Sequence, residues 1–246
     1  MKRLKYFLIF LLLFFQAIHN AHAQNEIKVA CIGNSITYGT GLDSDPELRK
    51  IKSYPYKLEI LLNTYYTGKT FIVSNYAVPG TTMLKDPNDG KGSTLDRKQH
   101  SYWEFNHGSG DGGGKVQYDL AIASVPDIVI IKFGTNDARW EVWGTDQGDG
   151  KNNFFNHYVE FINSFRAINP NVIVYICLPT PSFRDQTTDQ IRRIQEEVIP
   201  IIKQIARKNK VHLIDLHSEF YDGADKLLIL GDLDLVHPTA EGTTLI

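Results

Sequence analysis

Five short apolar runs, separated by longer amphipathic stretches, constrain the fold of this chain more than any other feature of its sequence. Most of the runs are rich in β-branched residues and almost free of polar interruptions, which is typical of strands buried on both faces. The stretches between them have the apolar spacing of helices that cover a sheet. The predicted strands are residues 27–32, 70–75, 127–133, 172–178 and 211–216, and the predicted helices are residues 54–66, 115–124, 153–168 and 190–209.

This alternation predicts an α/β fold in which helices cover both faces of a parallel sheet. No Pro/Ser-rich linker or internal repeat divides the chain, so residues 24–246 are predicted to form one domain. The closing stretch HPTAEGTTLI begins as a helix would and then stops, which indicates that the C-terminal helix is truncated. Ligands of parallel sheets bind beyond the carboxyl ends of the strands, so functional residues are expected directly after each run.

The N-terminal residues indicate export. Three basic residues among the first five precede an apolar run over residues 7–15, and a small-x-small sequence ends at Ala23. This order is typical of a secretory signal peptide over residues 1–23, cleaved before Gln24. The alternative is a membrane anchor, but the apolar run is shorter than the roughly 18 to 20 residues that a spanning helix needs. We therefore expect a periplasmic or secreted protein with no stable membrane insertion after cleavage.

Charge and cysteine use restrict the partners and the redox chemistry of the chain. Cleavage lowers the formal net charge from −2 to about −5, and a mildly acidic surface argues against a nucleic-acid partner. Cys31 and Cys177 both lie inside apolar runs, and a disulfide between them would require neighbouring strands. We expect two buried, free thiols.

Metal and cofactor motifs are missing from the sequence. His100 and His107 lie in a Gly-rich stretch, and no CxxC or HExxH spacing occurs. Residues 108–114, GSGDGGG, have the composition of a phosphate-binding loop, but they follow no predicted strand and lack the GK[ST] ending. We expect a plain loop there, and neither a metal nor a cofactor.

The first predicted strand ends in GNSITYG, which places Ser35 directly after a buried strand with a glycine two residues before it. A serine at such a helix start lies near backbone N–H groups that favour a developing negative charge. The alternative is an ordinary N-cap serine, and this motif alone does not decide between the two.

Two further strand ends carry candidate hydrogen-bond donors. Gly80, in SNYAVPGTTM, allows a close approach of the backbone and presents its own N–H, although a turn glycine is the alternative. Asn136, in FGTNDAR, follows an apolar strand, and its carboxamide is a known type of oxyanion donor. The alternative for Asn136 is an Asx-turn.

The last segment, DLDLVHPTAEG, supplies a base and a carboxylate for Ser35. A serine nucleophile needs a base to accept its proton, and the base needs a carboxylate that fixes its tautomer. His237 and Asp234 are three residues apart and fit these roles. Asp215 and His217 form a competing pair, but their position at a strand end favours a purely structural role.

These motifs in this order resemble the SGNH (GDSL-like) serine hydrolase superfamily, and the resemblance spans nearly the whole chain after residue 23. It implies a flavodoxin-like three-layer α/β/α sandwich with a five-stranded parallel sheet. It also implies a catalytic triad of Ser35, Asp234 and His237. The implied oxyanion hole consists of the backbone N–H groups of Ser35 and Gly80 and the side chain of Asn136. The first motif departs from the commonest form, which has aspartate where this chain has Asn34.

Within the superfamily, GNSITYG followed by GTNDAR looks most like exported carbohydrate acetylesterases, including sialate and xylan types. Trp103, Trp140 and Trp143 lie in post-strand loops, where an exposed indole can stack on a sugar. Trp140 and Trp143 are therefore candidate substrate-binding residues, with ordinary loop packing as the alternative. The expected partner is a small acylated substrate, an acetylated glycan.

Two other functions remain open. A lipase, lysophospholipase or thioesterase would use the same triad with an apolar cleft, whereas the long loops here are polar. A non-catalytic glycan-binding module is compatible with the fold. Such a module needs no nucleophile and base, so the joint presence of Ser35, Asn136 and His237 favours the esterase.

Overall fold

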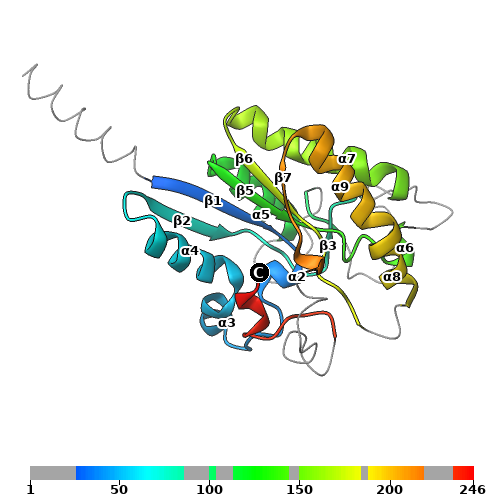
Figure 1. Ribbon diagram of the computed structural model, residues 1–246, viewed down its shortest axis with the longest axis horizontal. Helices are drawn as coiled ribbons and strands as arrows, with labels where there is room; N and C mark the ends of the chain where they lie inside the picture. The colour runs from blue at the N-terminus through cyan, green and yellow to red at the C-terminus, as the bar shows by residue number, and fades with distance from the viewer. Residues whose placement is uncertain (1–25, 86–99, 104–112, 144–149, 184–187, 219–234) are drawn as a thin grey trace, which may run out of the picture.

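The computed structural model describes residues 26–85, 100–103, 113–143, 150–183, 188–218 and 235–246. Its central element is a parallel sheet with the strand order β2-β1-β5-β6-β7, which confirms the predicted five-stranded sheet (Figure 1). The strands are β1 (Glu26–Gly33), β2 (Thr70–Asn75), β5 (Ile128–Lys132), β6 (Ile173–Cys177) and β7 (His212–Ile214). Each lies within one or two residues of its predicted bounds.

The strand order creates a switch point between β1 and β5. From β1 the chain moves to β2 on one side of the sheet, and it then returns to β5 on the other side. Gly33 and Lys132, the last residues of β1 and β5, pair in register, so both strands end at the same level. A crevice forms at such a point, because the segments that follow the two strands diverge from one another.

Helices cover the sheet on both faces. On one face, the apolar sides of α5 (Gly113–Ala123), α7 (Gly150–Ile168) and α9 (Ile199–Asn209) join the large core. On the other face lies α4 (Tyr54–Tyr65), next to α3 (Pro46–Lys52). The single helix predicted over residues 190–209 is α8 (Thr188–Arg193), a π-helical turn (Ile194–Val198) and α9. The short elements are α2 (Ser35–Tyr38), β3 (Thr81–Thr82), β4 (His100–Ser101), α6 (Trp140–Trp143) and a 3-10 turn (Gly242–Thr244).

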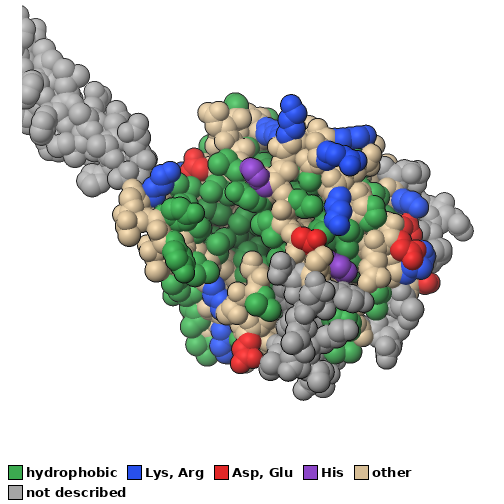
Figure 2. All heavy atoms as spheres, viewed as in Figure 1, with side chains coloured by type: hydrophobic (Ala, Val, Ile, Leu, Met, Phe, Trp, Pro, Cys, Tyr) green, Lys and Arg blue, Asp and Glu red, His purple; other side chains and the backbone are tan. Residues whose placement is uncertain are grey.

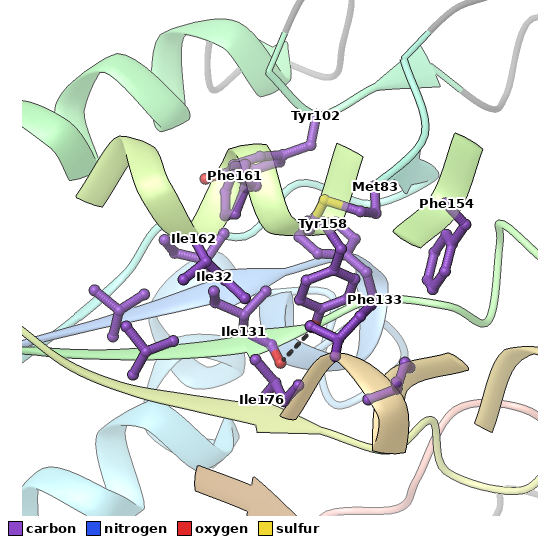
Figure 3. Close-up of a cluster of buried hydrophobic side chains, with 14 of the residues drawn as sticks. Ile32, Met83, Tyr102, Ile131, Phe133, Phe154, Tyr158, Phe161, Ile162 and Ile176 are labelled. Carbon is purple, nitrogen blue, oxygen red and sulfur yellow. Dashed lines mark hydrogen bonds between the residues drawn. The ribbon is translucent and has the colours of Figure 1, made fainter. Parts of the chain in front are cut away.

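The core of the first face is aromatic. Tyr102, Phe133, Tyr158 and Phe161 lie against the branched side chains of the strands, and the Tyr158 hydroxyl donates a hydrogen bond to the Ile131 carbonyl (Figure 3). The hydroxyl needs this partner, because a buried unpaired polar group would destabilise the core. Edge-to-face contacts of Phe161 with Tyr102 and Phe133 therefore help to fix how α7 lies on the sheet.

The second face is covered only in part by the described residues. Under α4 lies a small cluster that includes Val29, Cys31 and Phe71. Beyond it, Figure 2 shows hydrophobic side chains in a hollow between α4 and β7. Ile173 of β6 lies on this second face, since Val174 and Ile176 of the same strand face the large core, and it is 44% exposed.

Both cysteines are buried and free, as predicted. Cys31 lies on β1 and Cys177 on β6, and β5 separates these two strands. Burial raises the pKa of both thiols, which makes them poor nucleophiles.

No helix in the described ranges is both long and apolar enough to cross a membrane. The predicted signal peptide, residues 1–23, lies outside those ranges.

Candidate active site

The turn after β1 presents Ser35 at the edge of the sheet. Asn34 takes the N-cap position of α2, and Ser35 is the first residue of this four-residue helix. A side chain at Gly33 would meet the Lys132 carbonyl oxygen at 2.8 Å, so only glycine permits this close approach of β1 and β5. Gly39 ends α2 with φ 91°, a left-handed conformation that glycine adopts without strain. The helix therefore stays short, and the serine side chain remains at the crevice.

His237 contacts the serine directly. Its Nε2 atom lies 2.7 Å from Ser35 Oγ, although the two residues are 202 positions apart in the chain. The segment that carries the histidine is tied down on both sides. Before it, the Phe183 N–H donates to the Leu235 carbonyl at 2.9 Å, and after it the Lys57 ammonium donates to the Ala240 carbonyl.

The competing histidine lies elsewhere. His217 Nδ1 is 3.1 Å from the Pro179 carbonyl oxygen, and burial lowers the pKa of its imidazole. Asp215 accepts hydrogen bonds from the backbone N–H groups of His217 and Ser218, which is a capping arrangement. The pair therefore has a structural explanation. Asp234, the predicted orienting carboxylate, lies outside the described residues.

The two other predicted donors are held close to one another. The Asn136 carboxamide donates to the Thr81 carbonyl at 3.0 Å, which leaves its second N–H available. Gly80 precedes Thr81 and has φ 78°. The Val78 N–H donates to the Gly33 carbonyl, so the segment of Gly80 is tied to the end of β1. Among the described residues, no acceptor takes the backbone N–H of Ser35 or of Gly80.

Sequence reasoning missed the residues that support this arrangement. Asp137 is fully buried, and its carboxylate accepts the N–H groups of Leu84 at 2.9 Å and Gly134 at 3.0 Å. Burial raises the pKa of this carboxyl to about 6. From α8, Gln190 donates to the Thr135 carbonyl and Arg193 to the Ala138 carbonyl, each at 2.6 Å. The available signal for Asp137 was an acidic residue in the loop after a buried strand, next to Asn136.

Comparison with known protein families matches residues 31–245 to the GDSL-like Lipase/Acylhydrolase family. The chain belongs to this family. The match confirms the resemblance drawn from the motifs around Ser35, Asn136 and His237. Within the ranges that the structure describes, no three His, Cys, Asp or Glu side chains gather as metal ligands would.

Several proteins similar to this chain are named as esterases of acetylated carbohydrates. An acetylxylan esterase of Xylanibacter ruminicola is 27% identical over 244 residues, which cover 90% of this chain but only 42% of that protein. This chain thus spans less than half of the length of that relative. An acetylxylan esterase structure from Geobacillus stearothermophilus matches with a TM-score of 0.59 at 18% identity, covering 89% of this chain and 90% of that one. A carbohydrate acetylesterase structure from Sinorhizobium meliloti matches with a TM-score of 0.58 at 19% identity, covering 89% and 94%.

The structure corrects one expectation about the tryptophans of this GDSL-like chain. Trp143 is 3% exposed, packs on Phe154, and donates its indole N–H to Glu197 at 2.9 Å. It is a core residue with no free face for a sugar ring. Trp103 is buried too, and its indole donates to the Met83 carbonyl. The Trp140 side chain lies outside what the structure describes.

Proposed function

We propose that this chain is a serine esterase that removes acetyl groups from carbohydrates, with Ser35 as nucleophile, His237 as base and Asp234 as the carboxylate that orients the base. The observation that carries the proposal is the 2.7 Å contact between His237 Nε2 and Ser35 Oγ at the switch point of the sheet. A base within hydrogen-bond reach of a serine is the arrangement that activates the hydroxyl. Family membership agrees with this chemistry.

The proposed reaction has two steps. Ser35 Oγ attacks the acetyl carbonyl carbon while its proton passes to His237 Nε2, and a tetrahedral intermediate forms. When the intermediate collapses, the bond to the sugar oxygen breaks, and the histidine returns the proton to that oxygen. A water molecule, deprotonated by the same histidine, then attacks the acetyl-serine and forms a second tetrahedral intermediate. This intermediate collapses to acetate as the bond to Ser35 Oγ breaks and the histidine returns the proton to that oxygen.

The negative charge of both intermediates requires donors at the crevice. We assign this role to the N–H groups of Ser35 and Gly80 and to the Asn136 carboxamide. The free N–H groups and the Thr81 contact of Asn136 support the assignment, because donors fixed before the reaction need no reorganisation during it. Asp234 would hold the His237 tautomer and stabilise its charged form.

The substrate class rests on the relatives. The Xylanibacter ruminicola protein is an acetylxylan esterase, and the structural matches include a carbohydrate acetylesterase and an esterase active on acetylated mannans. We propose the same class of ester here, an acetylated glycan. Export of the chain, indicated by residues 1–23, would place the enzyme where such polymers are found.

The nucleophile is tested with Ser35→Ala. We expect kcat for p-nitrophenyl acetate to fall by roughly 10⁴- to 10⁶-fold with unchanged folding by circular dichroism, because the hydroxyl that forms the acyl-enzyme is gone. A fluorophosphonate should label the parent protein at Ser35 and leave the variant unlabelled. The matched control is Ser164→Ala, whose hydroxyl only donates to a carbonyl within α7, and it should keep full activity. An active Ser35→Ala protein would refute the proposal.

The acyl group is tested with esters of increasing length and with acetylated xylan and mannan oligosaccharides. We expect acetate release from the oligosaccharides and a fall in kcat/KM from acetyl to octanoyl esters. A lipase-like cleft would show the reverse trend, since each buried methylene contributes about 0.8 kcal/mol. Higher efficiency on octanoate would reject the carbohydrate substrate and leave the serine chemistry in place.

A further inference from the structure

Asp137 is a buried carboxylate with no assigned role in the reaction. It is 0% exposed, and burial of an unpaired charge strongly destabilises a fold. Its stabilisation comes from the backbone N–H groups of Leu84 and Gly134, each of which donates to one of its two oxygens. A carboxylate that accepts several N–H groups forms stronger hydrogen bonds than a neutral acceptor does.

These donors belong to two different segments of the chain. Gly134 lies in the loop that follows β5 and carries Asn136, whereas Leu84 lies in the segment that follows β2 and carries Gly80. The neighbouring side chain, Asn136, contacts the same segment through the Thr81 carbonyl. The adjacent side chains of Asn136 and Asp137 thus contact residues 80–84 at Thr81 and at Leu84, which are three positions apart.

Other contacts join this segment to β4, to Trp103 and to α7. The Trp103 indole donates to the Met83 carbonyl, and His157 Nδ1 accepts the Lys85 N–H at 3.2 Å. Neither contact reaches the loop after β5. The side chains of Asn136 and Asp137 supply hydrogen bonds between these two segments, at the Thr81 carbonyl and the Leu84 N–H.

We propose that Asp137 is a positioning residue for the oxyanion hole. Its carboxylate clamps the segment of Gly80 against the loop of Asn136, so that the two donors keep the spacing that a tetrahedral oxyanion requires. A misplacement of about 1 Å in such a site costs roughly 10²-fold in rate. The inference rests on the proposed esterase function and adds a residue that does not touch the substrate.

The first test is Asp137→Asn, which turns one oxygen into an NH₂ group that faces an N–H donor. We expect kcat for p-nitrophenyl acetate to fall by about 10²-fold while KM changes by less than about threefold. The matched control is Glu59→Gln, because Glu59 also accepts a strand N–H, that of Val73 at 2.7 Å, far from the crevice. The control should lower Tm and keep kcat. If Asp137→Asn likewise lowers Tm and keeps kcat, Asp137 is merely structural and the inference is wrong.

A double-mutant cycle with Asn136→Ala distinguishes a positioning role of Asp137 from a merely structural one. Asn136→Ala alone should lower kcat by about 10²- to 10³-fold. If Asp137 acts by placing Asn136, the double variant should lose far less than the product of the two single losses. If kcat of the double variant falls by the full product of the two single losses, the inference is wrong.

A second variant covers the case in which Asp137→Asn does not fold. Replacing Leu84 by its α-hydroxy acid removes the N–H that Asp137 accepts and changes no side chain. The ester also weakens the Met83 carbonyl as an acceptor for the Trp103 indole, so Trp103→Phe, which removes that hydrogen bond and keeps the Leu84 N–H, is the matched control. We expect kcat of the ester variant to fall by about tenfold at constant KM, and an unchanged kcat would contradict the clamp. Failure of the esterase proposal itself would appear separately, as an active Ser35→Ala variant.

Discussion

Ser35 and His237 come from opposite ends of the described chain, so their contact depends on how a few side chains hold the histidine segment. The Lys57 ammonium donates to the Ala240 carbonyl at 2.5 Å and to the Thr243 hydroxyl at 2.6 Å. That hydroxyl in turn contacts the Lys52 carbonyl. Helices α3 and α4 therefore fix the end of the chain next to the nucleophile.

The assignment of the base predicts different outcomes for the two candidate histidines. His237→Ala should lower kcat by roughly 10⁴-fold or more, because it deletes the group that accepts the serine proton. His217→Ala should change kcat by less than about threefold, since its Nδ1 lies against the Pro179 carbonyl, whereas His237 Nε2 is the atom that contacts Ser35 Oγ. Asp234→Asn should lie between them. Turnover of p-nitrophenyl acetate measures all three, and a dead His217→Ala protein would show that the assignment is reversed.

Some residues of the site could be predicted from sequence and others could not. The sequence predicts Ser35 and Asn136 because each follows a strand end, and it predicts His237 from the motif that it shares with Asp234. The structure brings Ser35 and His237 together. Their chemical roles stay predictions. Asp137 was missed because its partners are backbone N–H groups up to 53 positions away, which no side-chain pattern reveals. The prediction of an exposed Trp143 indole was wrong because the indole points to Glu197, which is 54 positions away in the sequence.

Among the secondary-structure elements, strands were easier to predict than short helices. The central strands are mostly apolar because helices cover one face of the sheet and part of the other, and this run of residues is visible in the sequence. The helix α3 was missed, although Asp45 caps its first N–H groups and Pro46 occupies its first position, which is a known start signal. The pair β3 and β4 has two residues in each strand, too few for any periodic pattern.

Strand β5 departs from the apolar rule at its last residue. Lys132 is 1% exposed, and burial lowers the pKa of its ammonium group from 10.5 to about 8. At Lys132 the unfolded chain therefore binds more protons than the folded chain between about pH 8 and pH 10.5. The contribution of Lys132 to stability should rise with pH over this window.

This linkage predicts that Lys132→Met stabilises the protein near neutral pH. The lowered pKa corresponds to a cost of roughly 3 kcal/mol for keeping the charged form buried, and methionine fills a similar volume without charge. We expect the free energy of unfolding in urea to increase by about 1 to 3 kcal/mol at pH 7. The gain should shrink as the pH rises to 10. A destabilised variant at pH 7 would mean that the ammonium has a strong partner in solution.

At the scale of the whole molecule, the strand order explains why the functional residues meet. Because β1 and β5 are neighbours at the switch point, the segments after Gly33 and Lys132 leave the same edge of the sheet in different directions. The fold class could be predicted because alternation of strands and helices has few solutions. The coverage of each face could not be predicted, since it depends on where each helix comes to lie.

The uneven coverage predicts that two isoleucines of one strand differ in their importance. Ile173 and Ile176 both lie on β6 and point to opposite faces, with exposed fractions of 44% and 0%. Both variants replace isoleucine by alanine on the same strand, so their loss of β-propensity is similar. A difference between their losses of stability therefore reflects the difference in burial. Ile176→Ala should cost about 2 to 5 kcal/mol, because it opens a cavity in the aromatic core. Ile173→Ala should cost less than about 1 kcal/mol.

Urea unfolding of the two variants measures this difference directly. Equal losses would show that the hollow between α4 and β7 is covered in solution. A loss at Ile173 that grows with protein concentration would then identify a second copy of the chain as the cover, because association stabilises the folded state by mass action. A loss independent of concentration would point to cover within the same chain. The small loss expected for Ile173 therefore tests whether this face of the sheet is open to water.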